Sequence, residues 1–370
     1  MTATKGLEGI VATTSSISSI IDGVLTYRGI DIDDLAENAT FEEVAYLLWY
    51  GKLPNAAELE QLIKDFNTYA PIPKAVIEQL KLYPKDANSM AALRTAVSCL
   101  ALYDEEANDM TPESNLRKAI KLQAQIPTII AAFARIREGK EPVAPKQSQS
   151  IAENFLYMLI GTEPDKVAVQ ALDTALVLHA DHELNASTFA ARVTVATLSD
   201  IYSGVVSAIG ALKGPLHGGA NEAVMAMLED IGTVDNVDSY VHDKMAKKQL
   251  IMGFGHRVYK NGDPRAKHLQ KMSQELGKIT GNMNWYDMSI KIEDIVTGEK
   301  GLKPNVDFYS ASVYTSLEIP RDLFTPIFAI SRASGWTAHI LEQFDNNRLI
   351  RPRAEYTGPV NQKYVSIENR

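Results

Sequence analysis

The sequence predicts an all-α, mostly helical protein, and three observations carry that prediction. Apolar residues recur at helical spacing along most of the chain up to residue 179. β-branched residues gather in only one stretch, residues 10–25, where Asp22-Gly23 indicates the turn of a short hairpin. Glycine, proline and polar residues follow the apolar runs, at the positions where helices end.

The individual helices follow from these apolar runs, taken in chain order. Residues 33–49 predict two helices, because the apolar set comes in two pieces, and Gly51 with Pro54 ends the second. Pro127 lies inside a predicted helix and should kink or restart it, because proline has no N–H to donate. Residues 139–146 hold two prolines and are predicted to be a loop. Further helices are predicted at residues 57–69, 89–103, 115–138, 148–160 and 166–179.

Size and charge limit the class of protein. With 370 residues the chain exceeds the usual size of a single core, so one large domain and one smaller domain are expected. Hydrophobic residues make up 45% and charged residues 22%, a balance typical of globular proteins. The formal net charge of -9 argues against general binding to nucleic acid or to a membrane surface, because a phosphate-binding face needs a basic surplus. Any phosphate must therefore be bound by a local basic patch.

The cysteine content and the N-terminal residues indicate the compartment. Cys99 is the one cysteine and lies in an apolar stretch, which excludes an intrachain disulfide and favours a buried, unreactive thiol. The first ten residues lack a positive segment followed by an apolar run, and no stretch reaches the apolar length of a membrane span. We therefore expect a cytoplasmic protein.

Four polar motifs hold most of the chemically useful side chains. They are residues 178–185 with His179 and His182, residues 213–222 with His217, residues 253–265 with His256 and Arg265, and residues 304–310 with Asp307. Any one of these histidines, taken alone, is more often structural than catalytic. The His179-x-x-His182 pair also suits zinc, but it lacks a third ligand in a recognisable motif, so we expect no metal site.

Taken together, the motifs favour catalysis. Glycines beside His217 and His256 allow the backbone to approach a ligand closely, and helix starts are expected next to both. The free N–H groups of a helix start disfavour a protonated imidazole. A histidine kept neutral in this way can donate a hydrogen bond to a carbonyl, which is the arrangement that an enolising enzyme needs.

The order of these motifs resembles the citrate synthase family over nearly the whole chain. The first matching features are His182 and the motif Gly-Pro-Leu-His-Gly-Gly-Ala-Asn-Glu. The Gly-Phe-Gly-His loop follows, with the arginine of Asp-Pro-Arg nine residues after its histidine. The last are Pro-Asn-Val-Asp and the arginines near the end of the chain, Arg332 and Arg351. The front end, at residues 6–9, 27–29 and 41–49, is similar to short bacterial and archaeal members. The resemblance implies a large helical domain, residues 1–218 and 326–370, with a smaller helical domain, residues 219–325, inserted into it.

The resemblance also implies a reaction and its catalytic residues. Members of the family condense acetyl-CoA with oxaloacetate and hydrolyse citryl-CoA to citrate and CoA. Asp307 matches the base that removes a methyl proton from acetyl-CoA, and His217 matches the neutral histidine that donates to the enol or enolate oxygen. His256 matches the histidine that polarises the ketone of oxaloacetate. A thioester methyl is a very weak acid, so its base must act beside a preorganised donor.

Binding residues and partners are implied in the same way. Oxaloacetate carries two carboxylates, which suit planar guanidinium groups. The family's oxaloacetate ligands fall on His182, Arg265, Arg332 and Arg351. The implied positive charges for the CoA phosphates are Lys248, Arg257 and Lys260. Family members are at least homodimers, in which one arginine, here Arg351, reaches the neighbouring site. Acetyl-CoA is a substrate, so no cofactor is expected.

Three alternatives remain open from the sequence. A 2-methylcitrate synthase uses the same catalytic set on propionyl-CoA, and one extra methylene is worth only about 1–3 kcal/mol in a pocket. A non-catalytic regulator that binds CoA or citrate would be expected to lose its base or an anion ligand, yet all of those positions are filled. A histidine-rich metal hydrolase would contain bound zinc.

Overall fold

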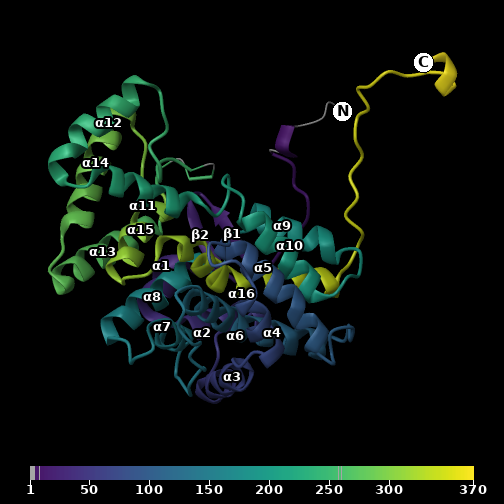
Figure 1. Cartoon of the computed structure of the whole chain (residues 1–370), viewed down its shortest axis with the longest axis horizontal. Coiled ribbons are helices and arrows are strands. Elements are labelled where there is room, and N and C mark those ends of the chain that lie inside the picture. The colour runs from purple at the N-terminus through teal and green to yellow at the C-terminus, as the bar shows by residue number, and fades with distance from the viewer. Residues whose placement is uncertain (1–4, 8, 257, 260) are drawn as a thin grey trace.

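The structure is a computed structural model that describes residues 5–7, 9–256, 258–259 and 261–370. Within those ranges it contains sixteen α-helices and one small antiparallel sheet, which confirms the predicted all-α class (Figure 1). No helix in the same ranges is both long enough and apolar enough to cross a membrane.

The helices fall into two groups according to their contacts. The first group comprises α1 (Ile32–Asn38), α2 (Phe41–Tyr50), α3 (Ala56–Tyr69), α4 (Lys74–Lys81), α5 (Ser89–Leu100), α6 (Pro112–Arg137), α7 (Ile151–Ile160), α8 (Lys166–His179), α9 (Ala186–Val195), α10 (Ile201–Leu212) and α16 (Phe324–Asp345). The second group comprises α11 (Ala220–Ile231), α12 (Val237–Ala246), α13 (Ala266–Thr280), α14 (Asn284–Lys300) and α15 (Val306–Ser316). Short 3-10 helices lie at Lys5–Leu7, Ala101–Tyr103, Val234–Asn236, Arg321–Leu323 and Ile367–Asn369.

Helix α16 lies at the centre of the first group. It is buried on all sides over most of its length, because apolar and small residues occupy every face. It packs against α2, α6, α8, α9 and α10. Gly335 allows a very close approach, since a Cβ there would meet the carbonyl oxygen of Ala180 at 2.4 Å. The segment that holds His182 is therefore pressed against the helix that holds Arg332.

The small sheet near the N-terminus is a hairpin with a third short strand. Strands β1 (Ser18–Ile21), β2 (Val24–Tyr27) and β3 (Ile30–Asp31) pair antiparallel in that order. Asp22 and Gly23 form the turn, both with positive φ (52° and 83°), as a two-residue hairpin turn requires. The predicted hairpin is confirmed, but the expectation that strand structure begins near residue 10 is wrong. Residues 10–17 pair with no neighbouring strand, so nothing completes a ladder there.

Most helices predicted in the first half of the chain are confirmed to within a few residues. Helix α8 begins and ends at the predicted residues, Lys166 and His179. The helix predicted at residues 115–138 is α6, which continues through Pro127, so the expected restart does not occur. Helix α6 packs against α3, α7 and α16, and its residues are buried on both sides of the proline. This burial stabilises the helix despite the missing hydrogen bond.

The second group of helices lies to one side of the first, at the upper left of Figure 1. Its members pack mainly on one another, α13 against α14 and α15, α11 against α15, and α12 against α14. Contact with the first group runs chiefly through α8 and α16, which touch α11, α13 and α15. The predicted functional residues on α15 and α16 therefore lie close to the junction of the two groups.

Candidate active site

The loop that carries His256 is hydrogen-bonded to the segment that leads into α15 and Asp307. The Gly-Phe-Gly-His loop pairs with the segment before α15: the Gly255 N–H donates to the Lys303 carbonyl (2.9 Å), and the Asn305 N–H donates to the Gly253 carbonyl (2.9 Å). The side-chain amide of Asn305 adds a bond to the Gly255 carbonyl at 3.0 Å. These bonds fix the histidine loop against the start of the helix that carries the aspartate.

The glycine at position 253 is required by both backbone geometry and packing. Its φ is +83°, a conformation that residues with a Cβ rarely adopt. A Cβ at this position would also lie 2.7 Å from a ring carbon of Phe308 and 2.8 Å from Val224. The loop can therefore lie this close to α11 and α15 only because residue 253 has no side chain.

Asp307 lies in the first turn of α15 with one buried oxygen that has no partner. The Asn305 side chain caps the helix by accepting the Asp307 N–H at 3.0 Å. Oδ1 of Asp307 is buried without a hydrogen bond to any described residue. Burial raises the pKa of the Asp307 carboxyl to about 6, and Arg265 and Arg332 oppose that rise. The carboxylate is therefore a stronger base than an ordinary aspartate, and it has a free acceptor oxygen.

His217 is held in one neutral tautomer. Its Nε2 accepts the backbone N–H of Ser187 at 3.3 Å and also contacts the Ser187 hydroxyl at 2.8 Å. An Nε2 that accepts leaves the single proton of a neutral imidazole on Nδ1. Burial, with a smaller effect from Arg332, lowers the pKa of His217 to about 4. His217 can therefore donate from Nδ1 at neutral pH without becoming charged.

The helix start that contacts the His217 ring is not the expected one. The sequence suggested the helix that follows the histidine, which is α11, beginning at Ala220. The bond instead comes from Ser187, at the second residue of α9, thirty positions earlier in the chain. The helix start that contacts the histidine is therefore distant in sequence and sets its tautomer, whereas the neutral state itself follows chiefly from burial.

His256 is held in the opposite tautomer by its own loop. Its Nδ1 accepts the backbone N–H groups of Val258 (3.0 Å) and Tyr259 (3.2 Å). A neutral His256 therefore carries its proton on Nε2. An N–H group at Nε2 is the donor that polarisation of a ketone oxygen needs.

His182 completes the group of imidazoles. Its ring centre lies 5.3 Å from that of His256, and its Nε2 lies 3.0 Å from the hydroxyl of Tyr259. Burial, followed by the positive charges of Arg265 and Arg332, holds the pKa of His182 well below its usual value. His182 is therefore a neutral hydrogen-bonding group rather than a cation.

Two of the predicted arginines are buried in the same region. Arg265 is 2% exposed and forms two hydrogen bonds with Asp263, at 2.9 and 2.8 Å. Arg332 is 1% exposed, donates from Nε to the His179 carbonyl at 2.7 Å and lies over the ring of Phe328. Burial lowers the pKa of Arg332 to about 10, so its guanidinium remains charged at neutral pH. Buried guanidinium groups of this kind suit an anionic ligand.

Two of the predicted binding residues, Arg351 and Lys248, are exposed and lie outside this group in the single chain. Arg351 is exposed and lies after α16, in an extended segment that leaves the body of the molecule (Figure 1). Lys248 is exposed in the loop that follows α12. Arg257 and Lys260 lie outside the described residues.

Reasoning from sequence missed three residues that hold the site together. Ser187 sets the tautomer of His217, Asp263 pairs with Arg265, and Tyr259 contacts His182. Only Asp263 gave a signal, because it lies two residues before Arg265 in the Asp-Pro-Arg motif. Ser187 acts over a long sequence separation and left no local pattern, and Tyr259, although it lies in the motif of His256, meets His182 across 77 positions.

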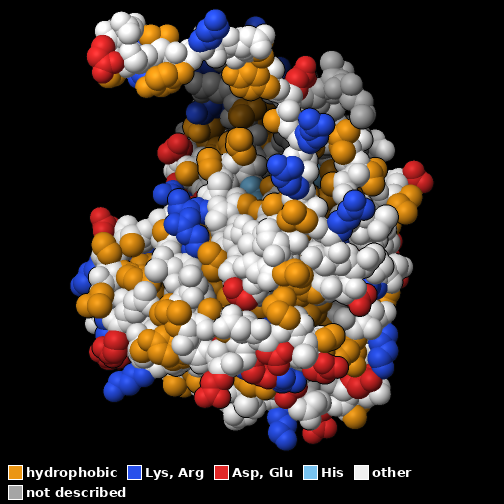
Figure 2. All heavy atoms as spheres, turned by 90° about the vertical axis from the view of Figure 1, so that its right-hand side faces the viewer, with side chains coloured by type: hydrophobic (Ala, Val, Ile, Leu, Met, Phe, Trp, Pro, Cys, Tyr) orange, Lys and Arg blue, Asp and Glu red, His pale blue; other side chains and the backbone are white. Residues whose placement is uncertain are grey.

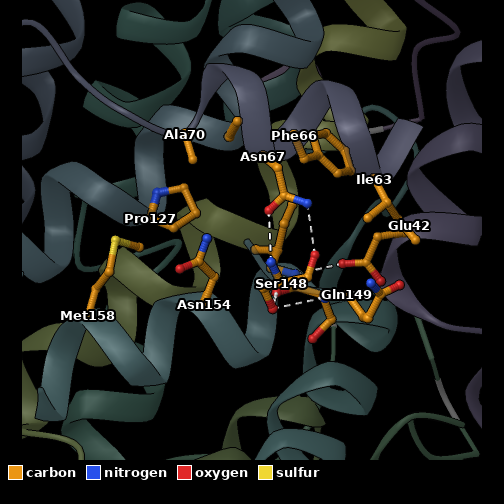
Figure 3. Close-up of a pocket in the computed structure, with 13 residues that line it drawn as sticks. Glu42, Ile63, Phe66, Asn67, Ala70, Pro127, Ser148, Gln149, Asn154 and Met158 are labelled. Atoms are coloured by element: carbon orange, nitrogen blue, oxygen red, sulfur yellow. Dashed lines mark hydrogen bonds between the residues drawn. The ribbon is translucent and has the colours of Figure 1, made fainter. Parts of the chain in front are cut away.

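One cavity adjoins His256, a second lies among helices of the first group, and His179 is bonded within the core. A cavity of about 180 Å³ lies beside His256 and is bounded on its other side by residues 301–304. A small cavity of about 20 Å³ lies among α2, α3, α6 and α7, with Glu42 on its wall (Figure 3). His179 is buried, and its Nδ1 bonds the Ala175 carbonyl at 2.7 Å. Across the described part of the chain, no three His, Cys, Asp or Glu side chains are placed to hold a metal ion.

The all-α fold brings together a carboxylate oxygen without a partner among the described residues, neutral imidazoles and buried guanidinium groups, a set that can accept a proton and bind an anion. Comparison with known proteins gives the family. A family model described as "Citrate synthase, C-terminal domain" matches residues 6–353. The chain is 66% identical to "Citrate synthase 2" of Bacillus subtilis over the full length of both. It is 50% identical to "Citrate synthase" of Haloferax volcanii, over 99% of this chain and 98% of the relative. The chain belongs to the citrate synthase family.

A solved structure and a further relative bear on the substrates. The ternary complex of carboxymethyl coenzyme A and oxaloacetate with citrate synthase from Thermoplasma acidophilum matches with a TM-score of 0.92 at 36% identity, over 98% of each chain. A "2-methylcitrate synthase 2" of Corynebacterium glutamicum is 41% identical, over 99% of this chain and 97% of the relative. The higher identities are to citrate synthases, so citrate synthase is the better supported function and 2-methylcitrate synthase is the alternative.

Proposed function

We propose that this chain condenses acetyl-CoA with oxaloacetate and hydrolyses the resulting citryl-CoA, which gives citrate and CoA. The observation that carries the proposal is the carboxylate of Asp307, whose buried Oδ1 lacks a partner among the described residues and whose pKa is raised to about 6. A base with a free oxygen beside neutral donors is what removal of a proton from a thioester methyl requires.

The two fixed tautomers assign the donors. Asp307 removes the methyl proton of acetyl-CoA while Nδ1–H of His217 donates to the thioester oxygen that gains charge. The enol or enolate carbon then attacks the ketone of oxaloacetate, and Nε2–H of His256 donates to the ketone oxygen. Water finally cleaves the thioester of citryl-CoA, which releases CoA as the thiol and citrate as the carboxylate.

Substrate anions are proposed to bind to two buried arginines and to basic residues between α12 and α13. The carboxylates of oxaloacetate pair with Arg265 and Arg332, and His182 adds a hydrogen bond. Lys248, Arg257 and Lys260 bind the CoA phosphates. Residues 219–325 act as a small domain that closes on the large domain, residues 1–218 and 326–370. Closure keeps water away from acetyl-CoA until the new carbon–carbon bond has formed.

A homodimer with a shared site is proposed for the assembly. The segment after α16 extends past the body of the chain and carries exposed apolar side chains (Figure 2). They are Leu349 (56% exposed), Tyr356 (71%), Val360 (67%), Tyr364 (83%) and Ile367 (68%). Apolar residues in such an arm are stabilised when they pack against another chain. Packing on a second copy would allow Arg351 to complete the neighbouring site, and the cytoplasm remains the predicted location.

One assay tests the proposed function and separates it from the alternatives. Purified enzyme is given oxaloacetate with either acetyl-CoA or propionyl-CoA, and both free CoA and the organic acid product are quantified. We expect citrate and CoA in equal amounts, with kcat/KM about 10-fold or more in favour of acetyl-CoA. A preference for propionyl-CoA would assign 2-methylcitrate synthase. Binding of CoA or citrate without turnover would assign a regulator and contradict the proposal.

A further inference from the structure

Tyr259 contacts three of the residues proposed to bind or activate oxaloacetate. It is 4% exposed, and its hydroxyl lies 3.0 Å from Nε2 of His182. Its ring centre lies 4.6 Å from that of His256, and the guanidinium of Arg265 lies 5.9 Å from the ring centre. This side chain does more than fill space in the core, because its one polar side-chain atom forms a hydrogen bond with His182.

We infer that Tyr259 is a positioning residue, which fixes the tautomer of His182 and thereby the nitrogen from which His182 donates to oxaloacetate. The inference deepens the proposed function and rests on it for the identity of the ligand. Tyr259 itself is not assigned a contact with the reacting atoms.

The direction of the hydrogen bond follows from the acidity of the two groups. A phenol is a stronger acid than the N–H of a neutral imidazole, and an imidazole nitrogen is a stronger base than a phenol oxygen. The favoured bond therefore runs from the Tyr259 O–H to Nε2 of His182. Burial raises the pKa of the Tyr259 hydroxyl, which keeps its proton in place. Burial also lowers the pKa of His182, so the ring has one proton rather than two.

An occupied Nε2 leaves that one proton on Nδ1. In a neutral imidazole, the hydrogen bond made at one ring nitrogen decides whether the other nitrogen carries the proton. His182 then presents a single donor, Nδ1–H, to a carboxylate. Without the tyrosine hydroxyl only a small backbone interaction of the His182 ring would remain. The second tautomer would then become accessible, and it would direct a lone pair instead of a proton at an anionic ligand.

The same contact links two distant parts of the chain. His182 follows α8, in the first group of helices, whereas Tyr259 lies in the loop between α12 and α13, in the second group. The backbone N–H of Tyr259 also bonds Nδ1 of His256 at 3.2 Å. Tyr259 therefore acts on the proton position of two histidines, through its amide, together with that of Val258, for His256 and through its hydroxyl for His182.

The test uses the Tyr259→Phe variant, which keeps the ring and the amide but removes the hydroxyl. We expect KM for oxaloacetate to rise about 3- to 10-fold, the value of one neutral hydrogen bond, with KM for acetyl-CoA changed less than about 2-fold. Nitrogen-15 NMR of the histidine-labelled enzyme, with His182 assigned by loss of its signals in His182→Asn, reports the tautomer directly. Wild type should show Nδ1–H, and Tyr259→Phe should show a mixture.

Controls keep the outcome interpretable. Tyr202→Phe also removes a buried hydroxyl, the one that bonds Asp104 in the first group of helices, and should leave KM for oxaloacetate unchanged. An Nε2–H tautomer in wild type overturns the inference, even if Tyr259→Phe fails to fold. An unchanged tautomer in Tyr259→Phe overturns it as well. Because the NMR measurement requires no turnover, a wild-type enzyme that shows Nδ1–H but makes no citrate would contradict only the proposed function.

Discussion

Asp263 pairs with Arg265 through two hydrogen bonds of 2.9 and 2.8 Å, and both side chains are almost completely buried. The same carboxylate accepts the backbone N–H of Val306 at 3.1 Å, one residue before Asp307. A proposed oxaloacetate ligand and the proposed base are therefore connected through one side chain that sequence reasoning did not select.

Replacement of Asp263 by asparagine should lower the free energy of unfolding, because it leaves the charge of Arg265 buried without a counter-ion. Breaking one partner of a buried pair is worth about 3–5 kcal/mol, and we expect a loss of that size in the free energy of unfolding. Denaturant unfolding measures it. The matched control is the double variant Asp263→Asn, Arg265→Gln, which leaves no lone charge and should recover much of the stability without recovering oxaloacetate binding. Independent, additive losses in the double variant would contradict this coupling.

Asp307→Asn should abolish most turnover while oxaloacetate binding stays nearly intact, since the base acts on the other substrate. Loss of a general base lowers kcat by roughly 10²- to 10⁴-fold. Steady-state kinetics gives kcat, and calorimetry gives the Kd for oxaloacetate. Asp294→Asn, an exposed aspartate of α14, serves as the control and should behave as wild type. A variant that kept half of the wild-type kcat would remove Asp307 from the mechanism.

The pH profile should show an acid limb set by Asp307. Its carboxyl has a pKa of about 6 in the folded enzyme and must be ionised to accept a proton, so kcat should fall about 10-fold per pH unit below pH 6. His217, with a pKa of about 4, stays neutral over that range and adds no second limb. Stopped assays from pH 4.5 to 8 measure the profile. A midpoint near the ordinary aspartate value, about 4, would show that burial does not act on the base as described.

The buried carboxyl of Glu42, outside the candidate site, should make the stability of the fold depend on pH. Glu42 is 1% exposed, lies on the wall of the small cavity in Figure 3, and accepts the Ile151 N–H at 2.8 Å. Burial raises the pKa of Glu42 to about 7, from 4.5 when exposed. The folded state therefore prefers the protonated acid, so the stability present below about pH 4.5 is lost as the pH rises toward 7.

Glu42→Gln should weaken this dependence, because glutamine is neutral and keeps an acceptor oxygen for Ile151, while Asp173, whose pKa is also raised by burial, retains a dependence of the same sign. Between pH 5 and 8, unfolding free energies should shift in favour of the variant by roughly 3 kcal/mol, the size of the pKa shift. Glu60→Gln, at an exposed position of α3, is the control and should show no such shift. Parallel stability curves for Glu42→Gln and wild type would contradict the prediction.

The sequence predicted those parts of the fold and site that depend on local patterns. Helix α8 was predicted to the residue because its apolar period is regular and polar groups follow His179. The motif residues His182, His256, Arg265 and Arg332 do come together. What could not be predicted depends on distant partners, such as the N–H of Ser187 that sets the tautomer of His217. Pro127 shows the same limit, because the burial of α6 overrides a local rule.

The last prediction concerns Arg351, which lies in the extended segment after α16 and is exposed in the single chain. If it completes the site of a second copy, Arg351→Ala and Asp307→Asn damage the same site from different chains. Each homodimer then has two incomplete sites. A mixed dimer has one site with native Asp307 and native Arg351, and one site with both lesions. Dimers purified with two different affinity tags should therefore regain about half of the wild-type turnover, since one of two equivalent sites is intact.

The competing arrangement gives the opposite result, because an Arg351 that served its own chain would leave one lesion in every site of the mixed dimer. Activity would then stay at the level of the single variants. A mixed dimer of Asp307→Asn with wild type provides the reference for one working site and should give the same turnover as the complemented pair. Sedimentation at assay concentration must show dimers in each sample. A monomer with full activity would contradict the shared site directly, since no second chain would be present to supply Arg351.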